Sequence, residues 1–361
     1  MKGCFGFLFL CLVFNFLGQP KFEKAIEYRQ KVGFLAAHRG VMAHMPRELG
    51  YAGELSYVLR SRGSKEYQKF YKYPSYGFTV FYGSVGNNLL LGNYLGTYGF
   101  AELPMVSVKN YRMDFKLGFG MGHTSKVYDP LLNPKNVAVS TKLLGMMCLA
   151  VKSTYFFGKN SVNIGLDITH FSNAAFKVPN FGINMPFVSL GYARTLVPIE
   201  KEKATKLEMT LPYDRWLYSI TGILSAKQNM PIGGKRYPVY ALNFSAKRFF
   251  NHRSGLELDV DLISKQAIMG YQPLVEKSQL DIVQMGIYSA YLVPLDRFHF
   301  VFGMGAYIRD KYHPEDKLYH RIGCRYFLKN GLILNFTLKT HWARADYLEY
   351  GIGYTFNYRK K

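Results

Sequence analysis

The stretch 161–173 reads SVNIGLDITHFSN and alternates apolar and polar side chains from one residue to the next. Val162, Ile164, Leu166 and Ile168 form the apolar set. A period of two is typical of a β-strand, whose successive side chains point to opposite faces. If the count continues, His170 and Ser172 share the apolar face. Such a pair would be unusual in a soluble core, but in a membrane barrel the apolar face meets lipid.

The same alternation recurs along most of the 361 residues and predicts the fold class. The clearest runs are 111–122, 255–264, 297–308 and 346–358. Aromatic residues make up 16% of the chain, glycine is frequent, and the mean hydropathy is −0.08. After the N-terminus, no run reaches the length of about 18 apolar residues that indicates a membrane helix. We therefore predict an all-β, antiparallel, transmembrane outer-membrane β-barrel of about 14–16 strands, in preference to a soluble β-sandwich.

Domain organisation follows from the two ends of the chain and from loop lengths. Residues 1–19 are typical of a signal peptide, and 20–361 are predicted to form a single barrel. Within it, about 30–197 form one half and 198–361 supply additional strands after a charged linker or turn. Short turns, such as the one at Lys159, face the periplasm in such barrels and long loops face outward. The strand carrying His170 should then end at the outer leaflet.

Charge and cysteine content limit the partners. The formal net charge is +22, which first suggests nucleic acid. The basic residues are scattered rather than clustered, so phosphorylated lipid head groups are the favoured partner and nucleic acid is not. Cys148 and Cys324 lack metal-cluster or CxxC spacing, and the sequence leaves their pairing open. Glu257, Asp259 and Asp261 are interpreted as lumenal countercharges for Lys and Arg, so no metal site is predicted.

The candidate chemistry is acyl transfer. Residues two apart on a strand have Cα atoms about 6.5–7 Å apart on one face, so His170 can act as a base for Ser172. Such a base needs a third group to orient it. Asn184, after the loop 173–183, begins the next predicted strand and can supply that group. Asn173 is a candidate oxyanion donor, and Lys177 in the loop is a candidate phosphate ligand.

The run His170-Phe171-Ser172-Asn173, followed by Pro179-Asn180 and Gly182-Ile183, resembles the lipid A 3-O-deacylase (PagL) family. The resemblance covers the motif and, loosely, residues 30–197. It implies an outer-membrane barrel that hydrolyses an ester-linked acyl chain of lipid A, without a cofactor. It also implies that Ser172 is the nucleophile, His170 the base and Asn173 the oxyanion partner.

One departure concerns Asn184, because that family has Glu at the corresponding position. A carboxylate stabilises an imidazolium by charge, whereas an amide only orients it. The spacing is also similar to that of the outer-membrane phospholipase A, whose orienting residue is Asn. Three functions stay open: a lipid A esterase of the bacterial outer membrane, a phospholipase with calcium as a candidate cofactor, and a porin-like or lipid-binding barrel without catalysis. The oligomeric state and whether the lumen is open are left undecided.

Overall fold

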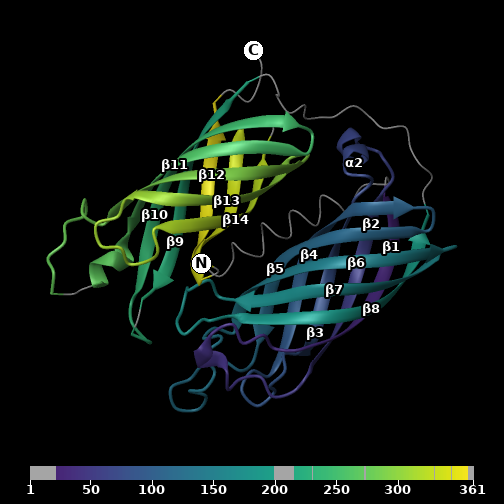
Figure 1. Ribbon diagram of the computed structural model, residues 1–361, viewed down its shortest axis with the longest axis horizontal. Helices are drawn as coiled ribbons and strands as arrows, with labels where there is room; N and C mark the ends of the chain where they lie inside the picture. Colours follow the sequence, from purple (N-terminus) through teal and green to yellow (C-terminus); the bar gives the residue numbers. More distant parts are fainter. Residues whose placement is uncertain are drawn as a thin grey trace. The chain divides into compact units, whose positions relative to one another are not determined.

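The computed structural model describes residues 22–198, 215–229, 231–271, 274–328, 330–342 and 344–356. In these residues, antiparallel strands close into two separate eight-stranded barrels (Figure 1). The prediction of an all-β, antiparallel barrel fold is confirmed. Among the described residues, no helix is long and apolar enough to cross a membrane. The predicted signal peptide, 1–19, lies outside the described residues.

The first barrel contains β1 (Phe22–Gly33), β2 (Gly50–Ser61), β3 (Ser75–Ser84), β4 (Asn93–Val108), β5 (Tyr111–Thr124), β6 (Leu143–Phe157), β7 (Asn160–Ser172) and β8 (Ile183–Val197). A short helix, η1 (Gly40–Met42), lies between β1 and β2, and α2 (Glu66–Phe70) lies between β2 and β3. Neighbours in sequence are neighbours in the sheet, and β8 pairs with β1 to close the barrel, for example through Tyr192 and Tyr28.

The second barrel contains β9 (Leu217–Gln228), β10 (Arg236–Asn251), β11 (Ser254–Lys265), β12 (Val283–Leu295), β13 (Phe298–Arg309), β14 (Leu318–Phe327), β15 (Leu332–His341) and β16 (Arg344–Thr355). The short helix η2 (Gln266–Gly270) follows β11. Pairing of β16 with β9 closes this barrel, for example through Tyr354 and Ile220.

The prediction of one barrel over residues 20–361 is therefore wrong, although the strand number is within the predicted range. Alternation and turn lengths are the same whether antiparallel strands close in one ring or in two. The choice depends on which distant strands exchange backbone hydrogen bonds, and that pairing leaves no local signal. The first half was predicted to begin at about residue 30. Instead β1 begins at Phe22 and ends at Gly33.

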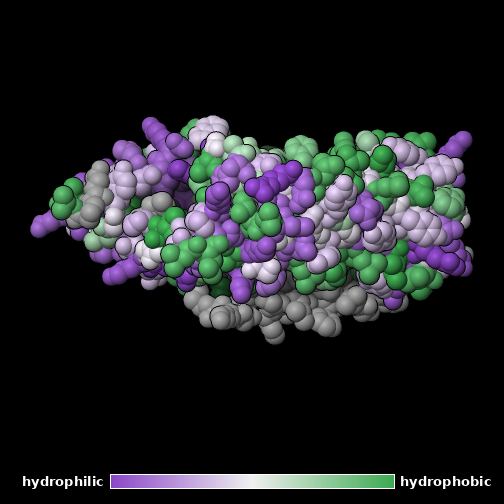
Figure 2. Space-filling model, turned by 90° about the horizontal axis from the view of Figure 1, so that it is seen from below, coloured by the Kyte–Doolittle hydropathy of each residue, from purple (hydrophilic) through white to green (hydrophobic). Residues whose placement is uncertain are grey.

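The two faces of the strands have opposite chemistry, as the alternation predicts. On β7, Ile164 and Leu166 point outward and are 57% and 65% exposed, whereas Asp167 and Thr169 point inward and are buried. Hydrophobic side chains accordingly occupy much of the outer surface that Figure 2 shows. This arrangement places the apolar face toward lipid and the polar face toward the lumen.

The lumen of the first barrel is filled by buried charges that neutralise one another. Glu54 accepts from Arg29 Nε (3.1 Å), from Lys31 Nζ (3.0 Å) and from the Tyr98 hydroxyl (2.8 Å). Lys31 also pairs with Asp167 at 2.7 Å. Toward the end where the long loops lie, an apolar cluster that includes Phe81, Tyr94, Phe171 and Phe187 packs inside the wall. An eight-stranded barrel is just wide enough for side chains to fill it, so a wide aqueous channel is not favoured.

The second barrel is filled in the same way. Arg321 contacts Glu349 (2.6 Å) and Asp261 (3.0 Å), and Arg325 contacts Glu257. The interpretation of the acidic strand 257–261 as lumenal countercharges is confirmed by these pairs. Cys148 faces the lumen of the first barrel and Cys324 belongs to the second, and both are free thiols.

Loop lengths differ between the two ends of each barrel. In the first, the connections 34–49, 85–92, 125–142 and 173–182 lie at one end, and the turns 109–110 and 158–159 lie at the other. The connection 62–74, which contains α2, is a long exception at the short-turn end. The second barrel has a similar asymmetry, with 229–235, 266–282 and 310–317 opposite 252–253 and 296–297, and the short connection 342–343 is an exception at the long-loop end. Ser172 is the last residue of β7, at the long-loop end of the first barrel.

We expect Glu54→Ala to destabilise the first barrel by about 3–5 kcal/mol, because removing one partner leaves the buried charges of Arg29 and Lys31 without their shared carboxylate. Heat-dependent gel mobility of the refolded protein would measure the loss. Leu55→Ala is the matched control, because Leu55 is the next residue on β2 and is 55% exposed on the outer face. Equal stability of the two variants would contradict the assigned role of the charge cluster.

Candidate active site

The last residues of β7 place His170 and Ser172 on the outer face of the first barrel. Both side chains are half-buried and continue the exposed row of Leu166 and Ile168, while Thr169 and Phe171 between them are buried in the lumen. The predicted facing of the pair is therefore present in the structure. On the neighbouring strand β6, Gly145 is opposite Ser172. A Cβ added at Gly145 would contact only the Ser172 carbonyl oxygen, at 3.4 Å, so the wall beside the hydroxyl is open.

Asn184 lies directly across from His170 in the pairing of β7 with β8. Its Oδ1 is 2.6 Å from His170 Nδ1. The hairpin thus brings together two residues that are 14 positions apart in sequence, as predicted from the loop length. An amide oxygen can only accept, so His170 Nδ1 carries the proton and Nε2 keeps its lone pair. An imidazole in that tautomer can take a proton from a hydroxyl group.

A second histidine, His38, holds the other side of the Asn184 amide. The chain after β1 continues beside the start of β8, where Ala36 N donates to Asn184 O at 2.9 Å. This contact brings His38 Nδ1 to 3.0 Å from Asn184 Nδ2. The same nitrogen is 3.5 Å from Ala36 O, which is the longer of its two contacts. With Nδ2 donating to His38, Oδ1 is directed at His170, so the amide orientation is fixed from both sides.

Asn180 contacts the hydroxyl group of Ser172. Its Nδ2 donates to Ser172 Oγ at 2.8 Å, and its Oδ1 accepts from the backbone N–H of Asn173 at 3.0 Å. The Asn173 side chain is buried and donates through Nδ2 to Ser140 Oγ at 3.2 Å. Asn180 therefore places an amide donor at the hydroxyl, while the Asn173 backbone and side chain bond to Asn180 and Ser140.

Two long loops are tied together above the site. Gly182 N donates to Ala138 O at 2.9 Å, and Phe181 N donates to Val137 O at 3.3 Å. Gly182 has a φ of +76°, and a Cβ there would lie 2.8 Å from His170 Cε1. Only glycine satisfies both the left-handed backbone and this close approach to the imidazole.

The last predicted site residue is Lys177. Lys177 is half-buried in the loop between β7 and β8. His44 lies in the loop between β1 and β2, and its Nε2 is 2.8 Å from the carbonyl oxygen of Lys135, in the loop between β5 and β6. His123 lies on β5. Within the part of the chain that the structure describes, no group of three or more His, Cys, Asp or Glu side chains is arranged to hold a metal ion.

Sequence reasoning missed the roles of Asn180, Gly182 and His38. Asn180 and Gly182 were part of the recognised motif, but nothing in the linear pattern shows which atoms they contact. His38 was not among the candidate residues of the sequence. β1 ends at Gly33, and the residues after it run beside β8. A sequence feature that marked this end of the strand would have pointed to His38.

We expect Gly182→Ala to slow the reaction of Ser172 with a serine-directed phosphonate probe by about a hundredfold, because the new Cβ displaces the His170 ring. Probe labelling followed over time would measure the rate. Gly158→Ala is the matched control: its φ is also positive, at +59°, but a Cβ there has nothing within 4 Å. Similar slowing in both variants would mean that backbone strain, and not the imidazole, is responsible.

Comparison with known protein families divides the chain into the same two parts as the two barrels. A family model described as lipid A 3-O-deacylase (PagL) matches residues 51–193, within the first barrel. A model described as acyloxyacyl hydrolase, C-terminal domain, matches residues 216–358, at the second barrel. His170, Ser172, Asn173, Lys177 and Asn184 fall within the first match, and His38 does not. A search of curated proteins finds no match to this sequence.

Among solved structures, the chain is similar to mutants of a porin from Rhodopseudomonas blastica. One has 10% sequence identity and a TM-score of 0.18, and a triple mutant has 8% and 0.17. In each case 93% of this chain and 100% of that chain are covered. These TM-scores are too low for the similarity to support any conclusion about this protein. The two family models, which match the two barrels in turn, show that the chain belongs to the lipid A 3-O-deacylase (PagL) family of acyloxyacyl hydrolases.

Proposed function

We propose that this protein is a serine esterase that removes an ester-linked acyl chain from lipid A, with its site at the outer leaflet of the bacterial outer membrane. The family and the barrel fold support the deacylase role and this membrane. The observation that carries the mechanism is the 2.6 Å contact between His170 Nδ1 and Asn184 Oδ1 on the lipid-facing wall, two residues from Ser172. The long loops at that end support the outer-leaflet assignment.

In the proposed reaction, Ser172 Oγ attacks the ester carbonyl carbon while His170 Nε2 takes the hydroxyl proton. The tetrahedral intermediate then collapses, the bond from carbon to the sugar oxygen breaks, and His170 returns the proton to that oxygen. The acyl group is left on Ser172. A water molecule, deprotonated by His170, attacks the acyl carbon, and the fatty acid leaves as Ser172 regains its proton.

The amide groups beside Ser172 would stabilise the oxyanion of both tetrahedral intermediates. Asn173 is the donor that we assign, through its backbone N–H, which now donates to Asn180 at 3.0 Å. Asn180 is assigned as its partner because its Nδ2 already lies 2.8 Å from Ser172 Oγ. Each such donor typically lowers the activation barrier by about 2.7–4 kcal/mol. Lys177 is proposed as a ligand for a lipid A phosphate.

Asn184 gives orientation without charge. A carboxylate at this position would stabilise the imidazolium that forms on His170, and the amide cannot do so. The contact between Asn184 and His38 partly compensates, because a fixed amide dipole needs no reorganisation when charge develops. We therefore assign His38 as a positioning residue that acts through Asn184.

A phospholipase is the second candidate, and the amide of Asn184 is the observation that favours it, since the outer-membrane phospholipase A resembled by this spacing also uses Asn. The chemistry at Ser172 would be unchanged, and calcium belongs to this alternative as a possible cofactor. Release of fatty acid from phospholipid micelles, without change in lipid A, would select it.

We expect lipid A from cells that produce the wild-type chain to lose one ester-linked acyl chain, and lipid A from cells with Ser172→Ala to keep it, because the variant lacks the nucleophile. The rate loss should be about 10³-fold or more. Mass spectrometry of extracted lipid A would measure the acylation. Identical spectra from the two strains, with both proteins folded in the outer membrane, would contradict the lipid A assignment.

We expect His38→Ala to lower kcat about tenfold with little change in KM, because Asn184 loses the acceptor that orients its amide. Initial rates on purified lipid A would separate the two constants. His38→Gln should restore part of kcat, because its side-chain oxygen can accept the same bond. His44→Ala is the control, as His44 lies in the same loop but bonds to Lys135. A change in KM alone would refute the positioning role.

A further inference from the structure

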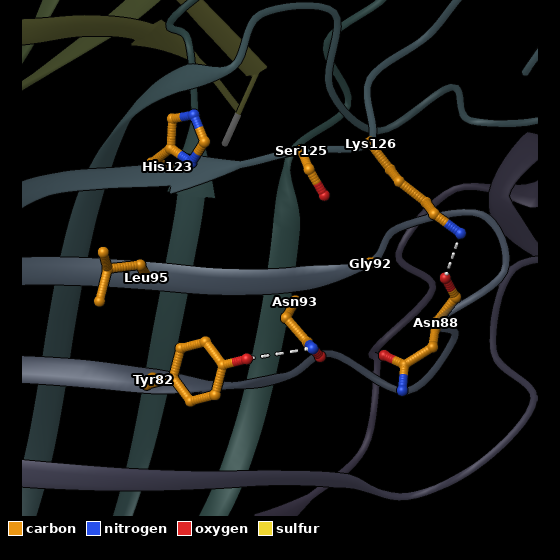
Figure 3. Close-up of a pocket in the computed structure, with 8 residues that line it drawn as sticks. All are labelled: Tyr82, Asn88, Gly92, Asn93, Leu95, His123, Ser125 and Lys126. Carbon is orange, nitrogen blue, oxygen red and sulfur yellow. Dashed lines mark hydrogen bonds between the residues drawn. The ribbon is translucent and has the colours of Figure 1, made fainter.

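A second polar site lies on the outer wall of the first barrel, at the same long-loop end as Ser172. It is a cavity of about 460 Å³ formed over β3, β4 and β5 (Figure 3). Its lining is Tyr82, Asn88, Gly92, Asn93, Leu95, His123, Ser125 and Lys126. None of the proposed catalytic residues belongs to it.

Lys126 is held at the edge of this cavity by the loop between β3 and β4. Its ammonium group donates to the carbonyl oxygens of Asn88 (2.9 Å) and Leu89 (3.0 Å), as Figure 3 shows for Asn88. An ammonium has three N–H groups, so one is left for a further acceptor. Gly92, with a φ of +64°, makes room for the lysine stem, since a Cβ there would lie 3.1 Å from Lys126 Cγ.

The other polar side chains of the cavity can each donate a hydrogen bond. Asn93 Nδ2 donates to the Tyr82 hydroxyl at 3.3 Å, and that hydroxyl keeps its own proton to donate. The hydroxyl of Ser125 and the ring of His123 add two more groups on the β5 side (Figure 3). The eight lining residues include no Asp or Glu. The carboxylate of Glu48 accepts from the backbone N–H of Asn88 at 3.3 Å and is not part of the lining. A site of donors with one cation selects an anion with several acceptor oxygens.

The apolar part of the cavity indicates that this anion is attached to a lipid. Leu95 and Tyr82 belong to the outward row of the wall and are 49% and 58% exposed. Asn88, Ser125 and Lys126 lie toward the loops, and Tyr82, Leu95 and His123 lie together farther along the strands (Figure 3). A tyrosine at the rim of a barrel is typical of the level of the membrane where head groups meet acyl chains.

The spacing His123-Thr124-Ser125 repeats that of His170 and Ser172, but it does not form a second active site. In the sheet, the residues opposite His123 are Leu95 on β4 and Leu143 on β6. Neither can orient an imidazole, whereas Asn184 lies opposite His170. The cavity therefore has the features of a binding site.

The cavity is close to Ser172 along the wall. His123 pairs with Leu143 on β6, and Ser172 pairs with Gly145 on the same strand, so the two lie two strands and two residues apart. Strand spacing and rise then separate them by about 12 Å. A phosphorylated disaccharide is large enough to span that distance, and Gly145 adds no side chain beside Ser172.

We infer that this cavity binds a phosphate-bearing head group of the same lipid whose acyl ester reaches Ser172. The choice of lipid rests on the proposed function. Lys126 supplies the charge, and Asn93, Ser125, Tyr82 and His123 supply hydrogen bonds. Recognition at two points on the wall would fix which ester lies at the nucleophile, because a head group held at Lys126 allows only part of the molecule to reach Ser172.

The binding test uses the full chain with Ser172→Ala, in nonionic detergent micelles, so that bound lipid is not hydrolysed. The probes are bisphosphorylated lipid A and the same lipid after removal of its phosphates, and native mass spectrometry measures both affinities. We expect the phosphorylated lipid to bind about tenfold more tightly, as for one charge-assisted contact. Adding Lys126→Gln should remove this preference, and Lys126→Arg should keep most of it.

Lys142→Gln is the matched control, because it removes the same charge from an exposed position in the same loop, outside the cavity. An equal loss of preference in this variant would show a general charge effect and overturn the inference. Equal affinity of the parent protein for the two lipids would also overturn it. Saturation by inorganic phosphate alone, with no added affinity for the lipid, would overturn the assignment to a lipid head group.

Kinetics separate this inference from the proposed function. In the chain with Ser172 intact, Lys126→Gln should raise KM about tenfold for phosphorylated lipid A, leave kcat unchanged, and have no effect on the dephosphorylated substrate. Deacylation that is indifferent to phosphate in both proteins would overturn the head-group site and leave the esterase. A phosphate preference in binding without any deacylation would keep the head-group site and overturn the esterase.

Discussion

The neutralisation of buried charge inside each barrel is the interaction on which the rest of the structure depends. Glu54 is shared by Arg29 and Lys31 in the first barrel, and Arg321 is held by Glu349 and Asp261 in the second. These ion pairs keep charged side chains inside the two lumens, because the same charges would be very unfavourable on the outer wall, which faces lipid. Since the interior is occupied, the surface that remains for chemistry is the outer face and the loops at its rim.

The proposed active site follows from that constraint. A strand that directs its charges inward directs its alternate side chains at lipid, and His170 and Ser172 occupy the last two of those positions on β7. Water-exposed loops tie down the end of the strand, where Asn180, Gly182 and His38 surround the pair. We propose that this position puts the site at the level where an ester between a head group and an acyl chain is found.

Asn184 determines how the proposed base, His170, is held, with an amide at the position where the family resemblance implies a carboxylate. The amide bridges His170 and His38, with contacts of 2.6 and 3.0 Å. Each partner limits the rotation of the amide, so orientation is gained although charge is not. His38, which makes one of these contacts, lies in the chain just after β1. The first strand therefore helps to position a residue of the site and also closes the barrel.

The sequence by itself determined the strand pattern, the lumenal role of Glu257 and Asp261, and the shared outward face of His170 and Ser172, because side chains alternate along any extended strand. It also placed Asn184 opposite His170, since a hairpin fixes its own register. The tertiary structure alone decided that the strands close as two barrels and that β1 begins at Phe22. It alone brought His38 to Asn184 and Asn180 to Ser172, and it formed the cavity at Lys126. Those features depend on contacts between loops and between distant strands, which alternation along one strand cannot encode.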